Sequence, residues 1–237
     1  GDMSTPVIAC GSTEEAFWGA MHALNWAERY QGPVLFLSEA SIAERAQDIP
    51  MPDLSQVVDE RRVVSKGEQG NRRYAGDGVS PFPVPGGPGA YVANASEHDE
   101  QGDTTHLPDI HVTMTERRFK KLELLNDGTY EAENTDADTV VLTWGGSKGS
   151  ALAAWRELDA EGVKVGWYYT MFLNPLPAKM LEELKGKRIL VPELNYMGQF
   201  AAYLRSKGLN AEAITQYTGL PFKVADLKAE IKRRVQA

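Results

Sequence analysis

Cysteine is nearly absent from this chain, because Cys10 is the only cysteine among its 237 residues. A single cysteine excludes an internal disulfide, and it excludes any cysteine-ligated metal or iron–sulfur centre built from this chain alone. Long hydrophobic runs are also missing: no apolar stretch approaches the roughly 20 residues that a membrane-spanning helix needs, and no signal peptide precedes the chain. We therefore expect a soluble, cytoplasmic protein with no membrane partner.

The chain also lacks a contiguous basic stripe. Its formal net charge is −8, with acidic and basic residues interspersed, so we expect no nucleic acid among its partners. Short basic clusters at 61–62, 72–73, 117–118 and 120–121 are interpreted as solvated faces or subunit contacts. What the chain does have is a hydrophobic content of 42%, which is enough for a full core in one or two domains.

The last hundred residues alternate short apolar runs with amphipathic helical runs, and Gly or Pro marks the boundaries. This alternation predicts an α/β fold with an open parallel sheet and right-handed crossovers. Most of the apolar runs are uniform enough for strands that are covered on both faces. The expected strands are 139–144, 163–169, 188–191 and 213–217, and the expected helices follow Gly149 and Pro177 and cover 199–207 and 224–235.

The first 44 residues predict a single β-α-β unit, with strands at 6–9 and 33–37 and a helix that begins at a capping box of Ser12 and Glu15. A unit of this size cannot cover both faces of its strands. It therefore either joins the later sheet or is the end of a domain whose first part is missing. We expect the second, because the chain begins at Gly1 without an initiator methionine.

Between 45 and 134 the periodicity fades, because prolines and glycines interrupt nearly every window long enough for a helix. Only 112–125 has a helical pattern. A connection this long is uncommon inside a compact fold, so we interpret it as an ordered functional or interface segment. The predicted division is thus 1–44, 45–134 and 135–237.

Two short motifs follow predicted strands and are candidate binding sites. The run 145–149, Gly-Gly-Ser-Lys-Gly, resembles a phosphate cradle, and it makes Gly146, Ser147 and Lys148 candidate cofactor ligands. It matches neither the P-loop nor the dinucleotide glycine pattern, so a plain strand-to-helix turn stays open as the alternative. Asn195 and Tyr196 follow another strand, where ligands of open sheets bind, but they could equally cap and pack a helix start.

A third motif places three carboxylates around one imidazole. Glu97, His98, Asp99 and Glu100 are the candidate catalytic residues, because such a cluster can tune a histidine or hold a hard cation. No second ligand set accompanies them at a defined spacing. A structural hydrogen-bond hub is therefore the alternative, and we assign no metal site to the chain.

Several runs together resemble a known family. They are GVSPFPVPG (78–86), NASEHDEQG (94–102), LTWGGSKGSALAAWRELDAEGVKVGWYYTMFLNPLP (142–177) and VPELNYMGQFAAYLR (191–205). In this order they resemble the C-terminal part of the α subunit of 2-oxoacid:ferredoxin oxidoreductases, with the 2-oxoglutarate type as the nearest. Residues 1–44 would then be the end of a pyrimidine-type thiamine-enzyme domain, and 135–237 a transketolase C-terminal-like domain.

The resemblance implies oxidative decarboxylation of a 2-oxoacid such as 2-oxoglutarate or pyruvate, with coenzyme A as acyl acceptor and ferredoxin as electron acceptor. It implies a β subunit that holds thiamine diphosphate, Mg2+ and an iron–sulfur cluster, and a γ subunit or domain. Where the family often has Arg after Ser-Pro, this chain has Phe82, which leaves a packing role for that position. A freestanding nucleotide-binding or flavodoxin-like module is the competing function class.

Overall fold

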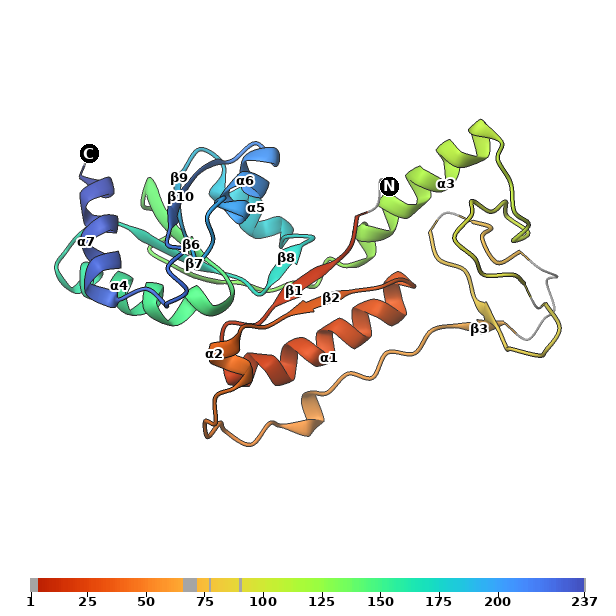
Figure 1. The fold of residues 1–237 in the computed structure, drawn as a ribbon, viewed down its shortest axis with the longest axis horizontal. Helices are drawn as coiled ribbons and strands as arrows, with labels where there is room; N and C mark the ends of the chain where they lie inside the picture. The colour runs from red at the N-terminus through yellow and green to blue at the C-terminus, as the bar shows by residue number, and fades with distance from the viewer. Residues whose placement is uncertain (1–3, 66–71, 77, 90, 237) are drawn as a thin grey trace. The chain divides into compact units, whose positions relative to one another are not determined.

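The computed structural model describes residues 4–65, 72–76, 78–89 and 91–236 (Figure 1). Contacts divide the chain into two compact units, and each is described by itself. Unit 1 comprises 1–6, 21–35 and 53–126, and unit 2 comprises 7–20, 36–52 and 127–237. Both units are discontinuous in sequence, so they cut across the predicted segments. Among the described residues, no helix is both long enough and apolar enough to cross a bilayer.

Unit 2 is built on a five-stranded sheet with the order β10-β9-β6-β7-β5. Its strands are β5 (Glu131–Glu133), β6 (Thr139–Thr143), β7 (Gly166–Tyr169), β9 (Arg188–Glu193) and β10 (Asn210–Thr215). The four strands from β10 to β7 are parallel, as expected, but β5 pairs antiparallel with β7. The sheet is therefore mixed, and the expectation of a purely parallel sheet is wrong at this edge.

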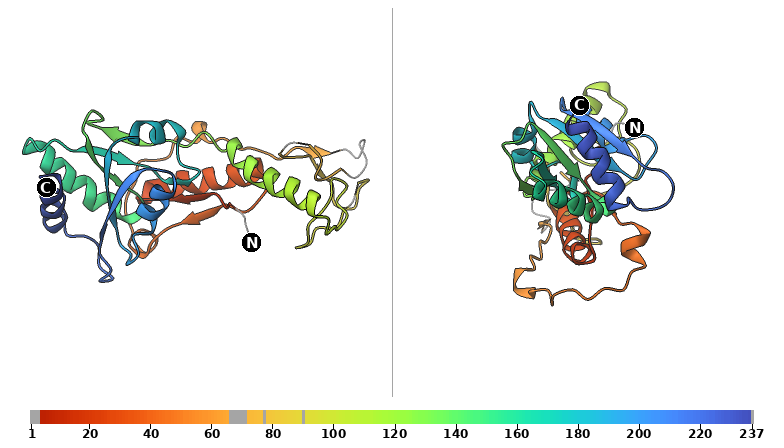
Figure 2. Two further views of the ribbon diagram at one scale, coloured as in Figure 1. Left: turned by 90° about the horizontal axis from the view of Figure 1, so that it is seen from above. Right: turned by 90° about the vertical axis from the view of Figure 1, so that its left-hand side faces the viewer.

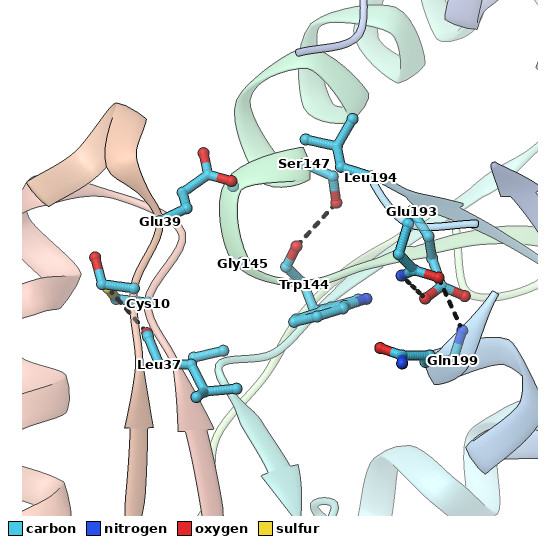
Figure 3. Close-up of a pocket in the computed structure, with 13 residues that line it drawn as sticks. Cys10, Leu37, Glu39, Trp144, Gly145, Ser147, Glu193, Leu194 and Gln199 are labelled. Carbon is cyan, nitrogen blue, oxygen red and sulfur yellow. Dashed lines mark hydrogen bonds between the residues drawn. The ribbon is translucent and has the colours of Figure 1, made fainter. Parts of the chain in front are cut away.

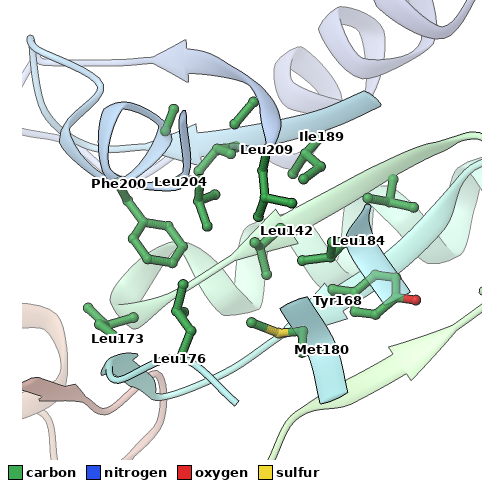
Figure 4. Close-up of a cluster of buried hydrophobic side chains, with 14 of the residues drawn as sticks. Leu142, Tyr168, Leu173, Leu176, Met180, Leu184, Ile189, Phe200, Leu204 and Leu209 are labelled. Atoms are coloured by element: carbon green, nitrogen blue, oxygen red, sulfur yellow. The ribbon is translucent and has the colours of Figure 1, made fainter. Parts of the chain in front are cut away.

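Alternate side chains of the central strands supply two separate cores, one on each face of the sheet. Val140 and Leu142 of β6 point into the core beneath α5 (Ala178–Leu184) and α6 (Gln199–Ser206), which Figure 4 shows. Val141, between them, points into the core beneath α4 (Lys148–Ala160) and α7 (Val224–Val235). In Figures 1 and 2, α4 and α7 accordingly lie together on one face of this sheet. The two-sided burial expected from the apolar runs is confirmed.

The helices predicted for this region are present with shifted ends, but two strands were not predicted. One is β5, and the other is β8 (Phe172–Asn174), which pairs antiparallel with β1 (Val7–Ala9). With β2 (Leu35–Leu37), these two strands form a second, three-stranded sheet. Ala9 of β1 packs into the α5–α6 core.

Helix α1 (Thr13–Tyr30) begins with the expected capping residues. Ser12 Oγ accepts a hydrogen bond from Glu15 N at 3.1 Å, and the Glu15 carboxylate accepts one from Gly11 N at 2.8 Å. The return bond therefore reaches one residue beyond the helix cap, a small departure from the expected capping box.

Unit 1 contains residues 21–30 of α1 and the helix α3 (Pro108–Lys120). Its other described elements are short: η1 (Leu54–Gln56), β3 (Val64–Ser65), β4 (Phe82–Pro83) and η2 (Lys121–Leu124). The short helix α2 (Ala40–Ala43) belongs to unit 2. β3 and β4 are parallel. The helix predicted at 112–125 exists, but it begins four residues earlier because Pro108 is well suited to a first helical turn.

The two-sided core yields a stability prediction. Leu142→Ala should lower the free energy of unfolding by about 2–5 kcal/mol, because Leu142 is fully buried and the cavity left behind cannot collapse between packed helices. Urea denaturation measures this. Leu220→Ala, at a residue that is 65% exposed, is the control and should be close to neutral. Equal effects of the two changes would contradict this account of the core.

Candidate functional site

A pocket of unit 2 lies at the carboxyl ends of β6 and β9, beside the ends of β1 and β2 (Figure 3). Its volume is about 280 Å³. Parallel strands commonly place binding groups at this edge. The polar side chains that line it are Cys10, Ser38, Glu39, Ser147, Glu193, Asn195 and Gln199, with the indole of Trp144 among them.

Trp144 follows β6 and supplies an unused donor to this pocket. Its Nε1 is buried and has no hydrogen-bond partner among the residues that the structure describes, and its ring packs against Phe200 at 5.7 Å between centroids. In Figure 3 the nitrogen end of the indole faces the side where Glu193 and Gln199 lie. Because a buried donor without a partner costs free energy, this nitrogen is a group that a ligand acceptor could satisfy.

Glu193 is the buried carboxylate of the pocket, and the start of α6 fixes it. It accepts hydrogen bonds from Phe200 N and Ala201 N, both at 2.9 Å, and from Asn195 Nδ2 at 2.8 Å. A carboxylate at a helix N-terminus also interacts favourably with the helix dipole. Gly198 makes this turn possible, because its φ of +61° favours glycine and a Cβ there would lie 2.6 Å from Ala213 Cβ.

The candidates Asn195 and Tyr196 separate at this turn. Asn195 lines the pocket, and its Oδ1 accepts hydrogen bonds from Gly198 N at 2.7 Å and Gln199 N at 3.2 Å. Tyr196 does not line the pocket; it is 74% exposed and packs edge-on against Tyr217 at 5.0 Å. The amide therefore closes the turn before α6, while the phenol lies on the surface.

The candidates Gly146, Ser147 and Lys148 also take different directions. Gly146 and Ser147 line the pocket, but the Gly146 backbone lies against the Glu39 side chain, so that a Cβ would meet its Cδ at 1.7 Å. Ser147 Oγ donates to Trp144 O at 2.8 Å. An anion held by the backbone at this position would meet the Glu39 carboxylate. The described lining of the pocket contains two carboxylates and no Lys or Arg, which is unfavourable for phosphate.

Lys148, the expected phosphate-binding cation, is instead neutralised inside the protein. Its Nζ lies 2.5 Å from Glu15 Oε1, 2.6 Å from Glu131 Oε1 and 3.9 Å from the centre of the Tyr169 ring. Tyr169 also donates a hydrogen bond to Glu15. Burial, followed by the nearby Glu15 charge, raises the pKa of Tyr169 well above its usual value. These contacts join the start of α1 to β7 and α4.

The candidate catalytic motif lies in unit 1, and each of its four side chains contacts different partners. The four residues are Glu97, His98, Asp99 and Glu100. Glu97 bonds Arg118 at 2.9 and 3.0 Å and His111 Nδ1 at 2.7 Å. His98 stacks on Tyr74, Asp99 accepts three backbone N–H bonds of its own turn, and Glu100 pairs with Arg72.

The surroundings of Glu97 alter its ionisation. Burial acts to raise the pKa of Glu97, but the hydrogen bonds from Arg118 and His111 outweigh it and hold the pKa below its usual value. Within the described residues, no group of three His, Cys, Asp or Glu side chains is placed to hold a metal ion. The four consecutive residues do not converge on a common point.

Comparisons with known proteins bear on both units. The family model "Pyruvate flavodoxin/ferredoxin oxidoreductase, thiamine diP-bdg" matches residues 2–117. The 2-oxoacid:ferredoxin oxidoreductase α subunit of Saccharolobus solfataricus is 31% identical over all of this chain, and the KorA subunit of 2-oxoglutarate oxidoreductase of Mycobacterium tuberculosis is 29% identical. The chain is thus similar in sequence to α subunits of 2-oxoacid:ferredoxin oxidoreductases. It spans 40% and 37% of the lengths of these two relatives.

A solved structure extends the similarity to three dimensions. The 2-oxoglutarate:ferredoxin oxidoreductase from Magnetococcus marinus, with 2-oxoglutarate, coenzyme A and succinyl-CoA bound, superposes with a TM-score of 0.91 at 31% identity. The superposition covers all of this chain and 43% of that one. The resemblance inferred from the sequence motifs is thereby confirmed at the level of the subunit.

One finer expectation is corrected by the same comparisons. The chain does not match as the C-terminal part of the α subunit: the matching family model is that of the thiamine diphosphate-binding domain. This match continues past residue 44 to residue 117, into the segment 45–134 that the sequence suggested as an irregular connecting and interface segment.

The pocket of unit 2 does not fit the diphosphate of thiamine diphosphate. A diphosphate and its metal need cations, backbone N–H groups or hard ligands directed at them. Here Glu39 and Glu193 face the cavity, the first amides of α6 bond Glu193, and Lys148 is neutralised elsewhere. Sequence reasoning missed Cys10, Glu39 and Trp144, although each lies just after a strand end.

The Lys148 cluster yields a stability prediction. Lys148→Met should destabilise the protein by about 1–3 kcal/mol, because it leaves Glu15, which is 17% exposed, without its cation. Denaturant unfolding measures this. The control Lys185→Met removes an exposed ion pair with Glu182 and should cost less than about 0.5 kcal/mol. A cost for Lys148→Met no larger than that of the control would contradict a structural role.

Cys10 yields a reactivity prediction. Burial raises the pKa of its thiol, and Sγ donates to Leu37 O at 3.5 Å. At neutral pH a chromogenic disulfide reagent should therefore modify the native chain at least about ten-fold more slowly than the guanidinium-unfolded chain, because both thiolate and access are limited. The single thiol makes the absorbance readout unambiguous. Equal rates would show that the pocket admits the reagent freely.

Proposed function

We propose that this chain is part of the α subunit of a 2-oxoacid:ferredoxin oxidoreductase of the 2-oxoglutarate type. The observation that carries the proposal is the TM-score of 0.91 over the whole chain against an enzyme that holds 2-oxoglutarate, coenzyme A and succinyl-CoA. Curated relatives of the same kind match nearly the whole chain, among them the 2-oxoglutarate oxidoreductase subunit of Mycobacterium tuberculosis. Pyruvate and other 2-oxoacids are the competing substrates.

The proposed reaction breaks the bond between the carboxylate and the keto carbon of the 2-oxoacid and forms a thioester with coenzyme A. Carbon dioxide leaves, and the two electrons released pass to ferredoxin. We propose that thiamine diphosphate, Mg2+ and the iron–sulfur cluster are held mainly by a β subunit. Support comes from the single cysteine of this chain and from the acidic pocket, which lacks a cation for a diphosphate.

Unit 1 is proposed to contribute a subunit interface. Many of its apolar side chains are exposed in the chain by itself: Val63, Val64, Val79, Val84, Val92, Val112 and Phe119. An apolar surface that a partner covers would account for exposed side chains of this kind. The β subunit is the proposed partner, with a γ subunit or domain and ferredoxin at the level of the complex. The alternative of a freestanding nucleotide-binding or flavodoxin-like module is disfavoured, because the pocket carries carboxylates where a phosphate would lie.

The test of this function is reconstitution. The chain alone should reduce no viologen dye with 2-oxoglutarate and coenzyme A, and it should show no calorimetric binding of thiamine diphosphate with Mg2+. Co-expressed within its complete subunit and with the thiamine-binding β subunit, it should support coenzyme A-dependent dye reduction. Pyruvate in place of 2-oxoglutarate tests the substrate class. Turnover by the pure chain, or a complex that is inactive with every 2-oxoacid, would sink the proposal.

A further inference from the structure

Arg73 in unit 1 is a buried cation with no carboxylate partner among the described residues. The sequence suggested a solvated face or a subunit contact at 72–73; Arg73 is only 8% exposed, and its guanidinium lies 3.9 Å from the centre of the Phe82 ring. Its Nε donates to Tyr91 Oη and its Nη1 to Ser80 O, both over a long 3.4 Å. Its Nη2 donates to none of the described residues. Most of the five guanidinium donors therefore remain available, although burial makes an unpaired charge costly.

Lys121 lies in the same cluster and has no carboxylate partner among the described residues. Its Nζ donates to Gln31 O at 3.3 Å and lies 4.4 Å from the centre of the Tyr30 ring. Gln31 in turn donates through Nε2 to Ser80 O, the carbonyl that also accepts from Arg73. Gln31 and Ser80 thus connect the two cations.

The charges around Lys121 are of one sign. Burial, followed by the charges of Arg117, Arg73 and Arg118, lowers the pKa of Lys121 to about 8. Arg117 adds a further guanidinium at Ser80, where Nη2 donates to Ser80 Oγ at 3.2 Å. Arg118 also pairs with Glu97. Such a concentration of positive charge favours an anion.

Three other arginines of unit 1 form ion pairs with carboxylates. Arg29 pairs with Glu60, Arg62 with Glu28 and Arg72 with Glu100. Arg73 is more deeply buried than these three, and no described carboxylate pairs with it. His98 Nε2, in the same cluster, is also buried and finds no hydrogen-bond partner in the described part of the chain. Its ring stacks on Tyr74, which borders Arg73.

We propose that Arg73 and Lys121 form a binding site for an oxoanion, the carboxylate or phosphate group of a small molecule. The guanidinium fork suits two oxygens of one such group, and the ammonium adds a point charge. Because Arg73 is only 8% exposed, it cannot form part of a broad contact with another protein, and a small group is the ligand that we propose. Inorganic phosphate, 2-oxoglutarate and coenzyme A present this chemistry, and they distinguish a general oxoanion site from a substrate or coenzyme site.

Binding should be linked to protonation of Lys121. In the free chain the Lys121 ammonium lies beside the Tyr30 ring, and burial with the charges of Arg117, Arg73 and Arg118 lowers its pKa to about 8. An anion bound beside the ammonium raises this pKa. At pH 8 a proton is therefore taken up on binding, whereas at pH 6.5 Lys121 already carries it. Affinity should fall as pH rises through 8, because the deprotonated amine no longer attracts the anion.

The test is calorimetry on the 237-residue chain in low salt, with inorganic phosphate, 2-oxoglutarate and coenzyme A titrated separately in buffers of different ionisation enthalpy. At least one of the three should bind. Arg73→Gln should weaken that binding roughly ten- to hundred-fold, as expected for lost charge-assisted hydrogen bonds. Lys121→Gln should abolish the proton uptake at pH 8. Arg72→Gln, which removes an exposed neighbour paired with Glu100, is the matched control and should bind as the parent chain does.

Several outcomes would overturn this site. One is the absence of binding by all three anions, and another is unchanged binding by Arg73→Gln. A third is that Arg73→Gln blocks assembly with the β subunit while no free anion binds, which would make the cations partner contacts. Circular dichroism checks that each variant folds, and Lys121→Gln keeps the test decisive if Arg73→Gln does not fold. Because no turnover is measured, the result is independent of the proposed reaction.

Discussion

Burial of the central strands on both faces is the constraint on which unit 2 depends. Val140 and Leu142 belong to one core and Val141 to the other, so β6 can keep its place only while helices cover both sides. The side-chain period of two then fixes the register, because a slip by one residue would exchange the two cores. The same arrangement brings the ends of β6 and β9 to one edge of the sheet. The pocket beside Trp144 and Glu193 follows from that geometry.

The two units handle buried charge in opposite ways. In unit 2, the Lys148 ammonium lies between Glu15 and Glu131, and Glu193 is held by the amides at the start of α6. Those charges are satisfied within the unit and serve to fix its elements. In unit 1, Arg73 and Lys121 have no carboxylate partner within the described ranges, although neighbouring arginines are paired. A buried charge without a counterion is costly, and an anion that binds beside it would lower this cost.

Sequence reasoning succeeded where one face or both faces of an element are apolar, and it failed where pairing alone defines the element. β6 and β9 were visible as apolar runs. β5 reads Glu-Ala-Glu and β8 is three residues long, so neither carries a period that could be recognised. The candidate binding residues show the same limit. Gly146, Ser147 and Asn195 line the pocket at the strand ends, as their positions in sequence suggested. The side-chain direction of Lys148 could not be predicted, because its partner Glu15 lies 133 residues away in sequence.

The sequence by itself determined the α/β alternation, the capping of α1, the family resemblance and the absence of a cysteine-ligated centre. These depend on local pattern or on composition, which need no knowledge of distant contacts. Only the tertiary structure decided which charges are neutralised, since Lys148 and Arg73 are equally basic in sequence and differ only in what surrounds them. It also decided that Glu97, His98, Asp99 and Glu100 diverge. Neighbours in sequence share a backbone, but burial and electrostatics depend on neighbours in space.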